Sequence, residues 1–275
     1  MIQKTGRTWP VFFALLLSMG TPAGADVTLD RLPAIAIIID DLGRQEAFGQ
    51  RAATLPGPVA CAFLPMARHT LELARLAHAR RKEVLLHLPM ESVDQRPLDA
   101  GGVTLDMTES QFRARVQESI DDVPYVSGVN NHMGSLLTRH PGAMSWLMSV
   151  MKQRGDLYFV DSRTTTQTVA LQVAREADLP STQRNVFLDD DPSNEAIDRE
   201  FRRLIALARR DGTALAIGHP YPETLAFLEQ RLPGLAERGI RLVPVSELIG
   251  LQQEEVQTWQ ASLSRSLRAA KSLKQ

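Results

Sequence analysis

Residues 34–41 read Ala-Ile-Ala-Ile-Ile-Ile-Asp-Asp, so six apolar residues run directly into two carboxylates. An unbroken apolar run of this length is typical of a strand that is buried on both faces, as in a parallel sheet covered by helices. The two aspartates would then lie at the carboxyl end of that strand. Because no glycine-rich GxGxxG motif follows the run, the sequence gives little support to a dinucleotide site.

Similar short apolar runs recur along the chain, and stretches with helical periodicity separate them. For example, Phe112, Val116 and Ile120 fall on one helical face, and Asp191-Pro192 is expected to begin a helix as N-cap and first residue. The alternation predicts parallel strands joined by covering helices, and hence a single distorted (β/α) barrel, with an open doubly wound sheet as the alternative. The predicted strands are 34–39, 59–63, 83–86, 125–129, 157–160, 184–188, 214–217 and 241–245.

The two ends of the chain differ in composition from the middle. Lys4 and Arg7 precede an apolar run at 11–19 and the small residues of Ala23-Gly24-Ala25, which together predict a cleaved secretory signal peptide over residues 1–25. The barrel would then occupy residues 26–250, and 251–275 would form a polar C-terminal tail or helix. No later segment is apolar enough to cross a membrane. We therefore expect an exported, periplasmic protein without a stable membrane span after cleavage.

Composition excludes several classes of protein. Lys plus Arg total 31 and Asp plus Glu total 32, which leaves a net charge of −1 and no basic excess for nucleic acid or an anionic membrane surface. Hydrophobic residues make up 44% of the 275 residues, enough for a sizeable core. The single cysteine, Cys61, excludes an internal disulfide framework and a cysteine-rich zinc site.

Polar side chains directly follow six of the predicted strands. In a parallel barrel the carboxyl ends of all strands open on one face, where active sites lie. Each group also has a structural interpretation: Asp40 and Asp41 could cap a helix, His87 could be a hydrogen-bonded core residue, and Asp189-Asp190-Asp191 is typical of a capping loop. The groups are Asp40-Asp41, His87, Asn130-Asn131-His132, Asp161-Ser162-Arg163, Asp189-Asp190-Asp191 and His219.

One carboxylate and two imidazoles make a three-ligand metal site of the catalytic type, and Asp41, His87 and His132 supply that set. A divalent cation there, for which Zn²⁺ is the expected ion, would lower the pKa of a water and polarise a carbonyl. Asp40 could then act as general base, and His219 could protonate a departing amine. Arg163 beside Asp161 could position or neutralise that carboxylate. Together these roles predict metal-assisted hydrolysis of an amide or ester.

An ordered set of motifs resembles the divergent polysaccharide deacetylase family, which is related to esterases that remove N-acetyl groups from chitin oligomers and peptidoglycan. The resemblance covers residues 33–248 and implies a distorted barrel in a bacterial envelope. It also implies that Asp40 is the base, Asp41 a ligand and His219 the acid. The motifs are Ile37-Ile38-Ile39-Asp40-Asp41-Leu42-Gly43, His87-Leu88-Pro89-Met90-Glu91, Gly128-Val129-Asn130-Asn131-His132-Met133-Gly134-Ser135, Phe159-Val160-Asp161-Ser162-Arg163 and Gly218-His219-Pro220.

The sequence departs from the better-known deacetylases at one ligand. Those proteins carry two histidines four residues apart, whereas here Glu91 follows His87 at that spacing. We therefore expect His132 to be the third ligand and Glu91 to be an outer partner or an alternative ligand. The residues expected to contact substrate are Glu91, Asn130, Asn131, Ser135 and Tyr221.

Three functions remain open at this point. The first is an exported metal-dependent deacetylase that acts on an N-acetylated envelope glycan, such as peptidoglycan or its fragments. The second is a catalytically inactive barrel that binds glycan or a cell-wall partner. The third is another metal hydrolase such as a phosphoesterase, for which the sequence shows no concentrated basic pocket.

Overall fold

The computed structural model describes residues 32–272, with side chains up to residue 259, so the predicted signal peptide lies outside the described residues. Within them, nine parallel strands form one sheet, in the order β6-β5-β4-β3-β2-β1-β8-β7 with β9 paired to the start of β1. The strands are β1 (Ala34–Leu42), β2 (Ala60–Phe63), β3 (Val84–Met90), β4 (Val126–Met133), β5 (Tyr158–Asp161), β6 (Ser181–Gln183), β7 (Val186–Phe187), β8 (Thr213–Gly218) and β9 (Arg241–Leu242).

The sheet curls into a distorted barrel, as the alternation in the sequence predicts. Its two end strands, β6 and β7, follow one another in the chain and are not paired with each other. Arg184 and Asn185 cross this gap, because the Arg184 N–H donates to the Asp161 carbonyl (2.9 Å) and the Asn185 N–H to the Leu215 carbonyl (2.8 Å). The predicted strand 184–188 is therefore wrong in its bounds, since the chain turns between two short strands at this point.

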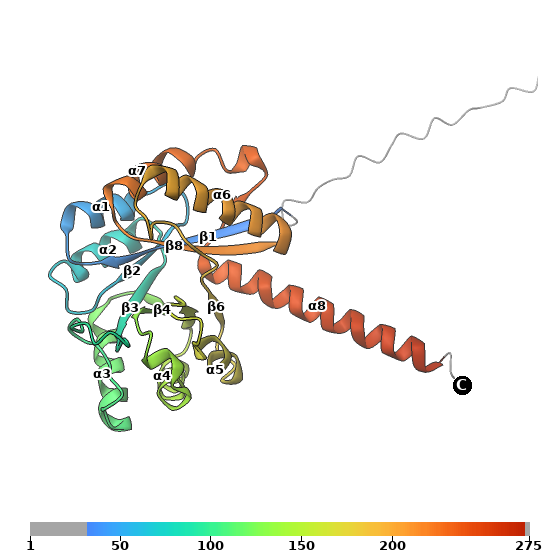
Figure 1. Cartoon of the computed structure of the whole chain (residues 1–275), viewed down its shortest axis with the longest axis horizontal. Helices are drawn as coiled ribbons and strands as arrows, with labels where there is room; N and C mark the ends of the chain where they lie inside the picture. Colours follow the sequence, from blue (N-terminus) through green and yellow to red (C-terminus); the bar gives the residue numbers. More distant parts are fainter. Residues whose placement is uncertain (1–31, 273–275) are drawn as a thin grey trace, which may run out of the picture. The chain divides into compact units, whose positions relative to one another are not determined.

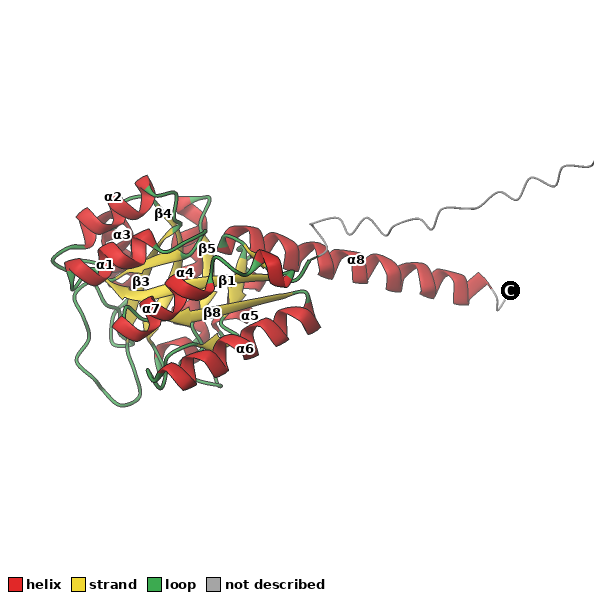
Figure 2. Cartoon of the chain, turned by 90° about the horizontal axis from the view of Figure 1, so that it is seen from above, coloured by secondary structure: helices red, strands yellow, loops and turns green. Residues whose placement is uncertain are grey.

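Helices surround the strands, as Figures 1 and 2 show. Ser193, not Asp191, is the N-cap of α6: its hydroxyl accepts from the Ala196 N–H, and Pro192 precedes the helix. The expectation for Asp191-Pro192 was wrong by two residues because the serine side chain can reach that N–H. The helices are α1 (Glu46–Thr54), α2 (Thr70–Ala79), α3 (Glu109–Asp122), α4 (Pro141–Arg154), α5 (Ala170–Glu176), α6 (Asn194–Asp211), α7 (Pro222–Arg231) and α8 (Val245–Ser272), with 3₁₀ turns η2 (Leu137–Arg139) and η3 (Ala236–Arg238).

Strand alternation divides the apolar residues into two clusters. Ile35, Ile37 and Ile39 of β1 pack outward against the helices, in a cluster that includes residues of α1 to α7. Ala34, Ala36 and Ile38 face the other way, into a smaller cluster built from strand residues and the beginning of α8. This second cluster is the interior of the barrel, where alanines of β1 and β2 pack beside larger side chains such as Leu85 and Tyr158.

Helix α8 begins at the amino-terminal end of the barrel. The Glu83 carboxylate, just before β3, accepts from the N–H groups of Val245 (2.6 Å) and Ser246 (3.1 Å), where a helix has unpaired donors. Leu248 and Ile249 then pack into the barrel interior. Polar residues from 251 onward continue this helix. Among residues 32–272, no helix combines the length and the apolarity that crossing a membrane requires.

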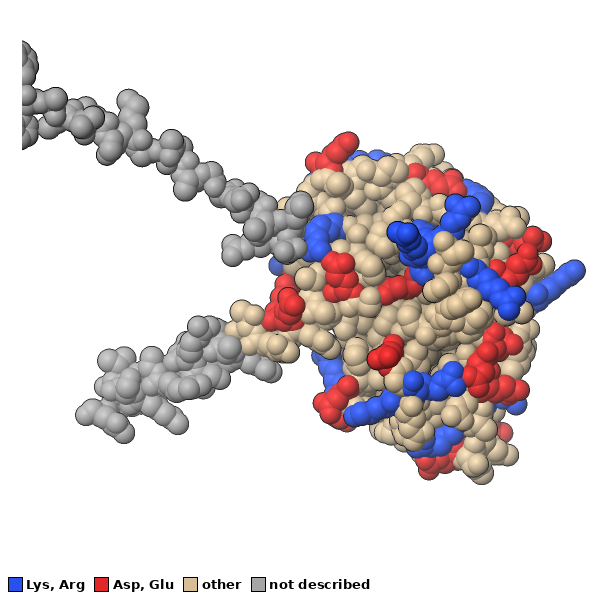
Figure 3. Space-filling view, turned by 180° about the vertical axis from the view of Figure 1, so that it is seen from behind, with Lys and Arg blue, Asp and Glu red and all other residues tan. Residues whose placement is uncertain are grey.

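The surface carries both signs of charge. On the face drawn in Figure 3, Lys and Arg side chains alternate with Asp and Glu side chains over the described part of the chain. This face therefore shows no large patch of a single charge.

Candidate active site

A backbone irregularity brings both aspartates of β1 to the mouth of the barrel. Continued alternation from Ala36 and Ile38 points Asp40 into the interior. Asp41 has a left-handed backbone with φ 57°, and the β1–β2 register shifts between Ile39 and Leu42. Leu42 then packs in the outer cluster again, so the bulge frees Asp41 to stay beside Asp40.

The two histidines reach the same mouth by strand alternation. In β3, Leu85 faces the interior while Leu86 and Leu88 face the helices, so His87 points inward. In β4, Val129 faces outward and His132 lies on the opposite face. Both strands continue past their apolar runs, because β3 extends to Met90 and β4 to Met133. His87 and His132 therefore lie within strands. The sequence predicts them after the strand ends, and that prediction is wrong.

Three ligand atoms meet at this mouth. Asp41 Oδ1 lies 3.2 Å from His87 Nε2 and 2.9 Å from His132 Nδ1, and the two nitrogens are 3.2 Å apart. Asp41 Oδ1 is buried, yet it accepts no hydrogen bond of good geometry from the described residues. A buried acceptor without a donor is costly unless a cation or water satisfies it. This nitrogen and oxygen donor set fits a divalent metal such as Zn²⁺.

Outer contacts orient both imidazoles toward Asp41. Asn130 Nδ2 donates to Asp40 Oδ1 (2.8 Å), which leaves Asn130 Oδ1 to accept from His87 Nδ1 (2.9 Å). On the far side, His132 Nε2 lies 3.2 Å from Asp99 Oδ2, and Arg44 holds that carboxylate at 2.6 Å. With those nitrogens protonated, His87 Nε2 and His132 Nδ1 are left with free lone pairs that face Asp41.

The charges around this cluster are strongly coupled. Burial raises the pKa of Asp40, although the charges of His87 and His219 oppose that shift. Burial raises the pKa of Asp41, but the interactions of its carboxylate with His132 and His87 outweigh burial and hold the pKa of Asp41 well below its usual range. Burial lowers the pKa of His87, whereas the charge of Asp40 raises it. The net effect raises the pKa of His87 to about 8. The same cluster thus shifts the pKa values of the two neighbouring carboxylates in opposite directions.

His219 stands at the end of β8, held by a buried aspartate. Asp189 Oδ1 accepts from His219 Nδ1 (2.9 Å), and Asp189 Oδ2 accepts from the His219 N–H (2.6 Å) and the Thr224 hydroxyl (2.7 Å). Burial lowers the pKa of His219, whereas Asp189 raises it. The net effect is a raised pKa. Tyr221 places its half-exposed ring 5.6 Å from the His219 ring, at the rim of the mouth.

Five other predicted residues lie outside the cluster, in contacts that hold loops. They are Asn131, Ser135, Asp161, Arg163 and Glu91. Asp161 points toward the helices and accepts from the Arg163 N–H (2.8 Å) and the Thr168 hydroxyl (2.9 Å). The Asn131 amide joins β4 to the Ser162 N–H. The Ser135 hydroxyl accepts from the Val93 N–H.

Glu91, the alternative ligand, is also engaged elsewhere. Its carboxylate accepts from the Leu105 N–H at 2.7 Å, and its backbone N–H donates to the Val103 carbonyl. These bonds anchor the loop 91–106, which carries Asp99 to His132. Glu91 therefore positions a loop in this structure, while His132 occupies the place beside Asp41.

Sequence reasoning missed two residues of the site, Asp99 and Asp189. Asp99 lies in the segment 97–106, whose Pro, Gly and Asp residues indicate only a surface loop. Asp189 was interpreted as part of a capping loop, although alternation along β7 could have indicated it: Val186 and Leu188 pack outward, so Phe187 and Asp189 face His219.

Comparisons with known proteins agree with this geometry. The sequence profile of the divergent polysaccharide deacetylase family matches residues 37–249. The chain is 35% identical to YibQ of Escherichia coli K12, an uncharacterized protein, over 246 residues that make up 90% of this chain and 74% of that one.

Two solved structures share the fold. A crystal structure of the uncharacterized protein ATU2773 from Agrobacterium tumefaciens C58 matches with a TM-score of 0.75 at 24% identity, over 79% of this chain and 89% of that chain. A deacetylase solved with substrate matches with a TM-score of 0.50 at 13% identity, over 82% of this chain and 94% of that chain. The profile match spans most of the barrel, and the chain belongs to the divergent polysaccharide deacetylase family.

Proposed function

We propose that this chain is an exported, metal-dependent deacetylase of an N-acetylated cell-envelope glycan, such as peptidoglycan or its fragments. The observation that carries the proposal is the convergence of Asp41, His87 and His132 within hydrogen-bonding distance of one another, beside Asp40. Family membership supports the reaction class. The predicted signal sequence at residues 1–25 supports export.

The roles of the residues follow from their positions. A divalent cation held by Asp41, His87 and His132 would polarise the amide carbonyl and lower the pKa of the attacking water. Asp40, held by Asn130, accepts the proton of that water as its oxygen bonds to the carbonyl carbon. His219 donates its proton to the amide nitrogen as the carbon–nitrogen bond breaks. The products are acetate and a free amine on the sugar.

Two matched substitutions separate the base from the ligand. We expect Asp40→Asn to keep about one metal ion per chain while acetate release from an N-acetylated chitin oligosaccharide or peptidoglycan fragment falls about 10²–10⁴-fold. Asp41→Asn should lose both the metal and the activity, because it removes a ligand. The control is Asp94→Asn on the exposed loop, where the carboxylate contacts only Ser92 and Arg96 among the described residues.

One outcome would favour a different function. If the metal-loaded chain binds these glycans but releases no acetate, the barrel is a non-catalytic glycan-binding protein. If it instead releases phosphate from an aryl phosphate in an Asp40-dependent manner, it is a phosphoesterase. Either result replaces the proposed deacetylase.

A further inference from the structure

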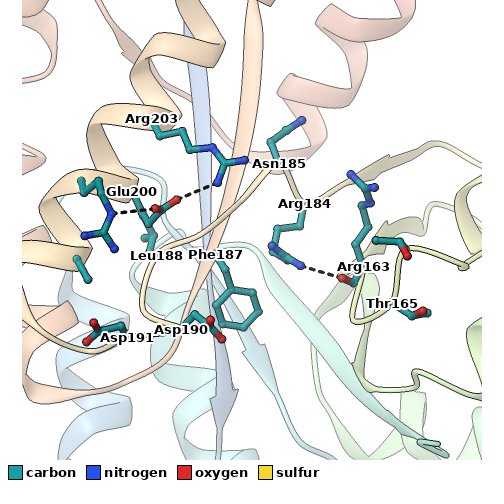
Figure 4. Close-up of a pocket in the computed structure, with 13 residues that line it drawn as sticks. Arg163, Thr165, Arg184, Asn185, Phe187, Leu188, Asp190, Asp191, Glu200 and Arg203 are labelled. Carbon is teal, nitrogen blue, oxygen red and sulfur yellow. Dashed lines mark hydrogen bonds and ion pairs between the residues drawn. The ribbon is translucent and has the colours of Figure 1, made fainter.

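A cavity of about 480 Å³ lies at the gap between β6 and β7, and none of the three candidate metal ligands lines it. Figure 4 shows Arg163 and Arg184 on one side, Glu200 and Arg203 of α6 on the other, and the Phe187 ring between them. The cavity exists because the barrel does not close here, so the loop after β5 and the first turns of α6 form walls where strands would pair.

The cavity contains guanidinium groups in excess of the carboxylates that could neutralise them. Of the four arginines in its lining, Arg199 and Arg203 pair with Glu200 at 3.5 and 3.1 Å. Neither Arg163 nor Arg184 has a carboxylate oxygen within 4.0 Å in the described part of the chain.

The two acidic residues at the rim change this balance little. Asp191 is engaged with the backbone at the start of α6, where it accepts from the Ser193 N–H at 3.0 Å. Asp190 is exposed to solvent, which screens its charge. Two guanidinium groups without an ion pair, half-buried Arg184 and exposed Arg163, therefore share the cavity with one solvated carboxylate.

Two hydrogen bonds fix the position of the Arg184 guanidinium, and one of its edges has no hydrogen-bond partner among the described residues. Its Nε donates to the Ser162 carbonyl (2.7 Å) and its Nη2 to the Arg163 carbonyl (2.8 Å), while Nη1 makes no hydrogen bond to the described residues. The group lies 4.6 Å from the Phe187 ring centroid. Burial and the like charge of Arg163 lower the pKa of Arg184, and they outweigh the opposing charges of Asp161, Asp40 and Asp190. An anion between the two arginines would relieve that repulsion and desolvation.

The cavity is next to the proposed proton donor. The Phe187 ring, which lines it, lies 5.1 Å from the His219 ring. If the reacting sugar of a glycan lies at the mouth, a substituent close to that sugar would reach past Phe187 into the cavity. Arginine recognises planar oxyanions through paired N–H groups, and a carboxylate matches that fork.

We propose that this cavity binds a carboxylate carried by the glycan, so that the protein selects acidic N-acetylated glycans over neutral ones. The inference takes from the proposed function only that the ligand is an N-acetylated glycan. It adds Arg163 and Arg184 as residues that determine specificity.

Direct binding tests the inference without turnover. Zinc-loaded protein carrying Asp40→Asn is titrated with a peptidoglycan oligosaccharide that bears free lactyl carboxylates, and with the same oligosaccharide after conversion of those groups to methyl amides. We expect the acid to bind at least about tenfold more tightly than the amide, the size of one charge-assisted hydrogen-bond pair. Arg184→Gln should bring the two dissociation constants close together. Arg163→Gln provides the same test should Arg184→Gln fail to fold.

The matched control is Arg202→Gln on α6, outside the cavity, where the guanidinium pairs with Asp198. That variant should keep the full preference for the acid. Equal affinity of the wild-type cavity for acid and amide overturns the inference, as does failure of the acid to bind. Tighter binding of a 6-O-phosphorylated chitin oligosaccharide than of the carboxylated glycan also overturns it, because the anion would then be a phosphate.

The two proposals fail separately. Acetate release by the wild-type protein with no preference for the acid removes the inference and leaves the deacetylase in place. A clear preference for the acid without any acetate release removes the deacetylase and leaves the binding site in place.

Discussion

His132 lies between two carboxylates, and each acts on a different ring nitrogen. Asp41 faces Nδ1 at 2.9 Å, and Asp99 faces Nε2 at 3.2 Å. A carboxylate that accepts from the outer nitrogen fixes the tautomer of a ligating histidine and raises its basicity. We therefore expect Asp99 to be a positioning residue, which would support a bound metal through His132.

Removing the Asp99 charge should weaken metal binding without removing a ligand. We expect Asp99→Asn to lower the affinity for Zn²⁺ about 10–100-fold, as measured by competition with a coloured chelator. The control is Asp94→Asn in the same loop, which should leave that affinity unchanged because Asp94 contacts only Ser92 and Arg96 among the described residues. An unchanged affinity in Asp99→Asn would show that the hydrogen bond to His132 does not support the ligand.

The Asp189–His219 pair should set the alkaline limit of the reaction. A general acid works only while protonated, and the net effect of burial and Asp189 is to raise the pKa of His219. We therefore expect the proposed activity to persist to higher pH than an unperturbed histidine would allow. In Asp189→Asn the charge is gone, the pKa of His219 falls, and the alkaline limb of the kcat/KM profile should move to lower pH.

A pH profile of kcat/KM for both proteins gives this shift directly. Asp191→Asn is the matched control, because it changes a neighbouring aspartate whose hydrogen bonds among the described residues go to Ser193 and not to His219. An alkaline limb at the same pH in Asp189→Asn and in the wild type would mean that His219 is not the group that must stay protonated.

At the scale of a single element, β1 contributes side chains to both the outer cluster and the barrel interior. Its outward isoleucines fill the layer beneath the helices, while Ala34 and Ala36 face the barrel interior. Small residues are needed there because the strands converge on a narrow space that α8 closes with Leu248 and Ile249. The same strand then presents Asp40 to the mouth, so packing of the interior also determines where the proposed base stands.

Enlarging an interior side chain should therefore be costly. We expect Ala36→Leu to lower the free energy of unfolding by about 1–3 kcal/mol through overpacking, measured by urea denaturation. The same substitution at exposed Ala79 of α2 should change it by less than about 0.5 kcal/mol. If the two variants are equally stable, the interior has more free volume than its burial indicates.

For the whole molecule, the metal should stabilise the fold. The ligands come from β1, β3 and β4, so a bound ion joins three strands that the unfolded chain keeps far apart. An ion at about 1,000 times its dissociation constant adds about 4 kcal/mol to stability. We expect Tm to rise on addition of Zn²⁺ to chelator-treated protein and to fall again with chelator.

The size of the rise should depend on the ligand set alone. His132→Ala should abolish the metal-dependent shift in Tm, because it removes one of the three ligand atoms. His69→Ala at the start of α2 should retain it, because His69 lies outside that set. A shift that survives His132→Ala would place the ion elsewhere in the molecule.

The sequence alone determined much of this protein. Buried strands have to be continuously apolar, so alternating apolar runs and helical periods indicated the barrel and the residues near its mouth, among them Asp41, His87 and His132. The apolar signal stopped at Leu86 and Val129 because polar side chains take over at the mouth, although the strands continue to Met90 and Met133.

Only the tertiary structure decided how those residues divide between the metal cluster and the loops. Asp161 and Glu91 look like site residues in the chain, but alternation and loop contacts direct both carboxylates to backbone donors. Asp99 and Asp189 reach the histidines across long sequence separations, which no local pattern records. The physical reason is that hydrogen-bond partners are chosen by distance in space, whereas sequence patterns report only the secondary structure and burial of each segment.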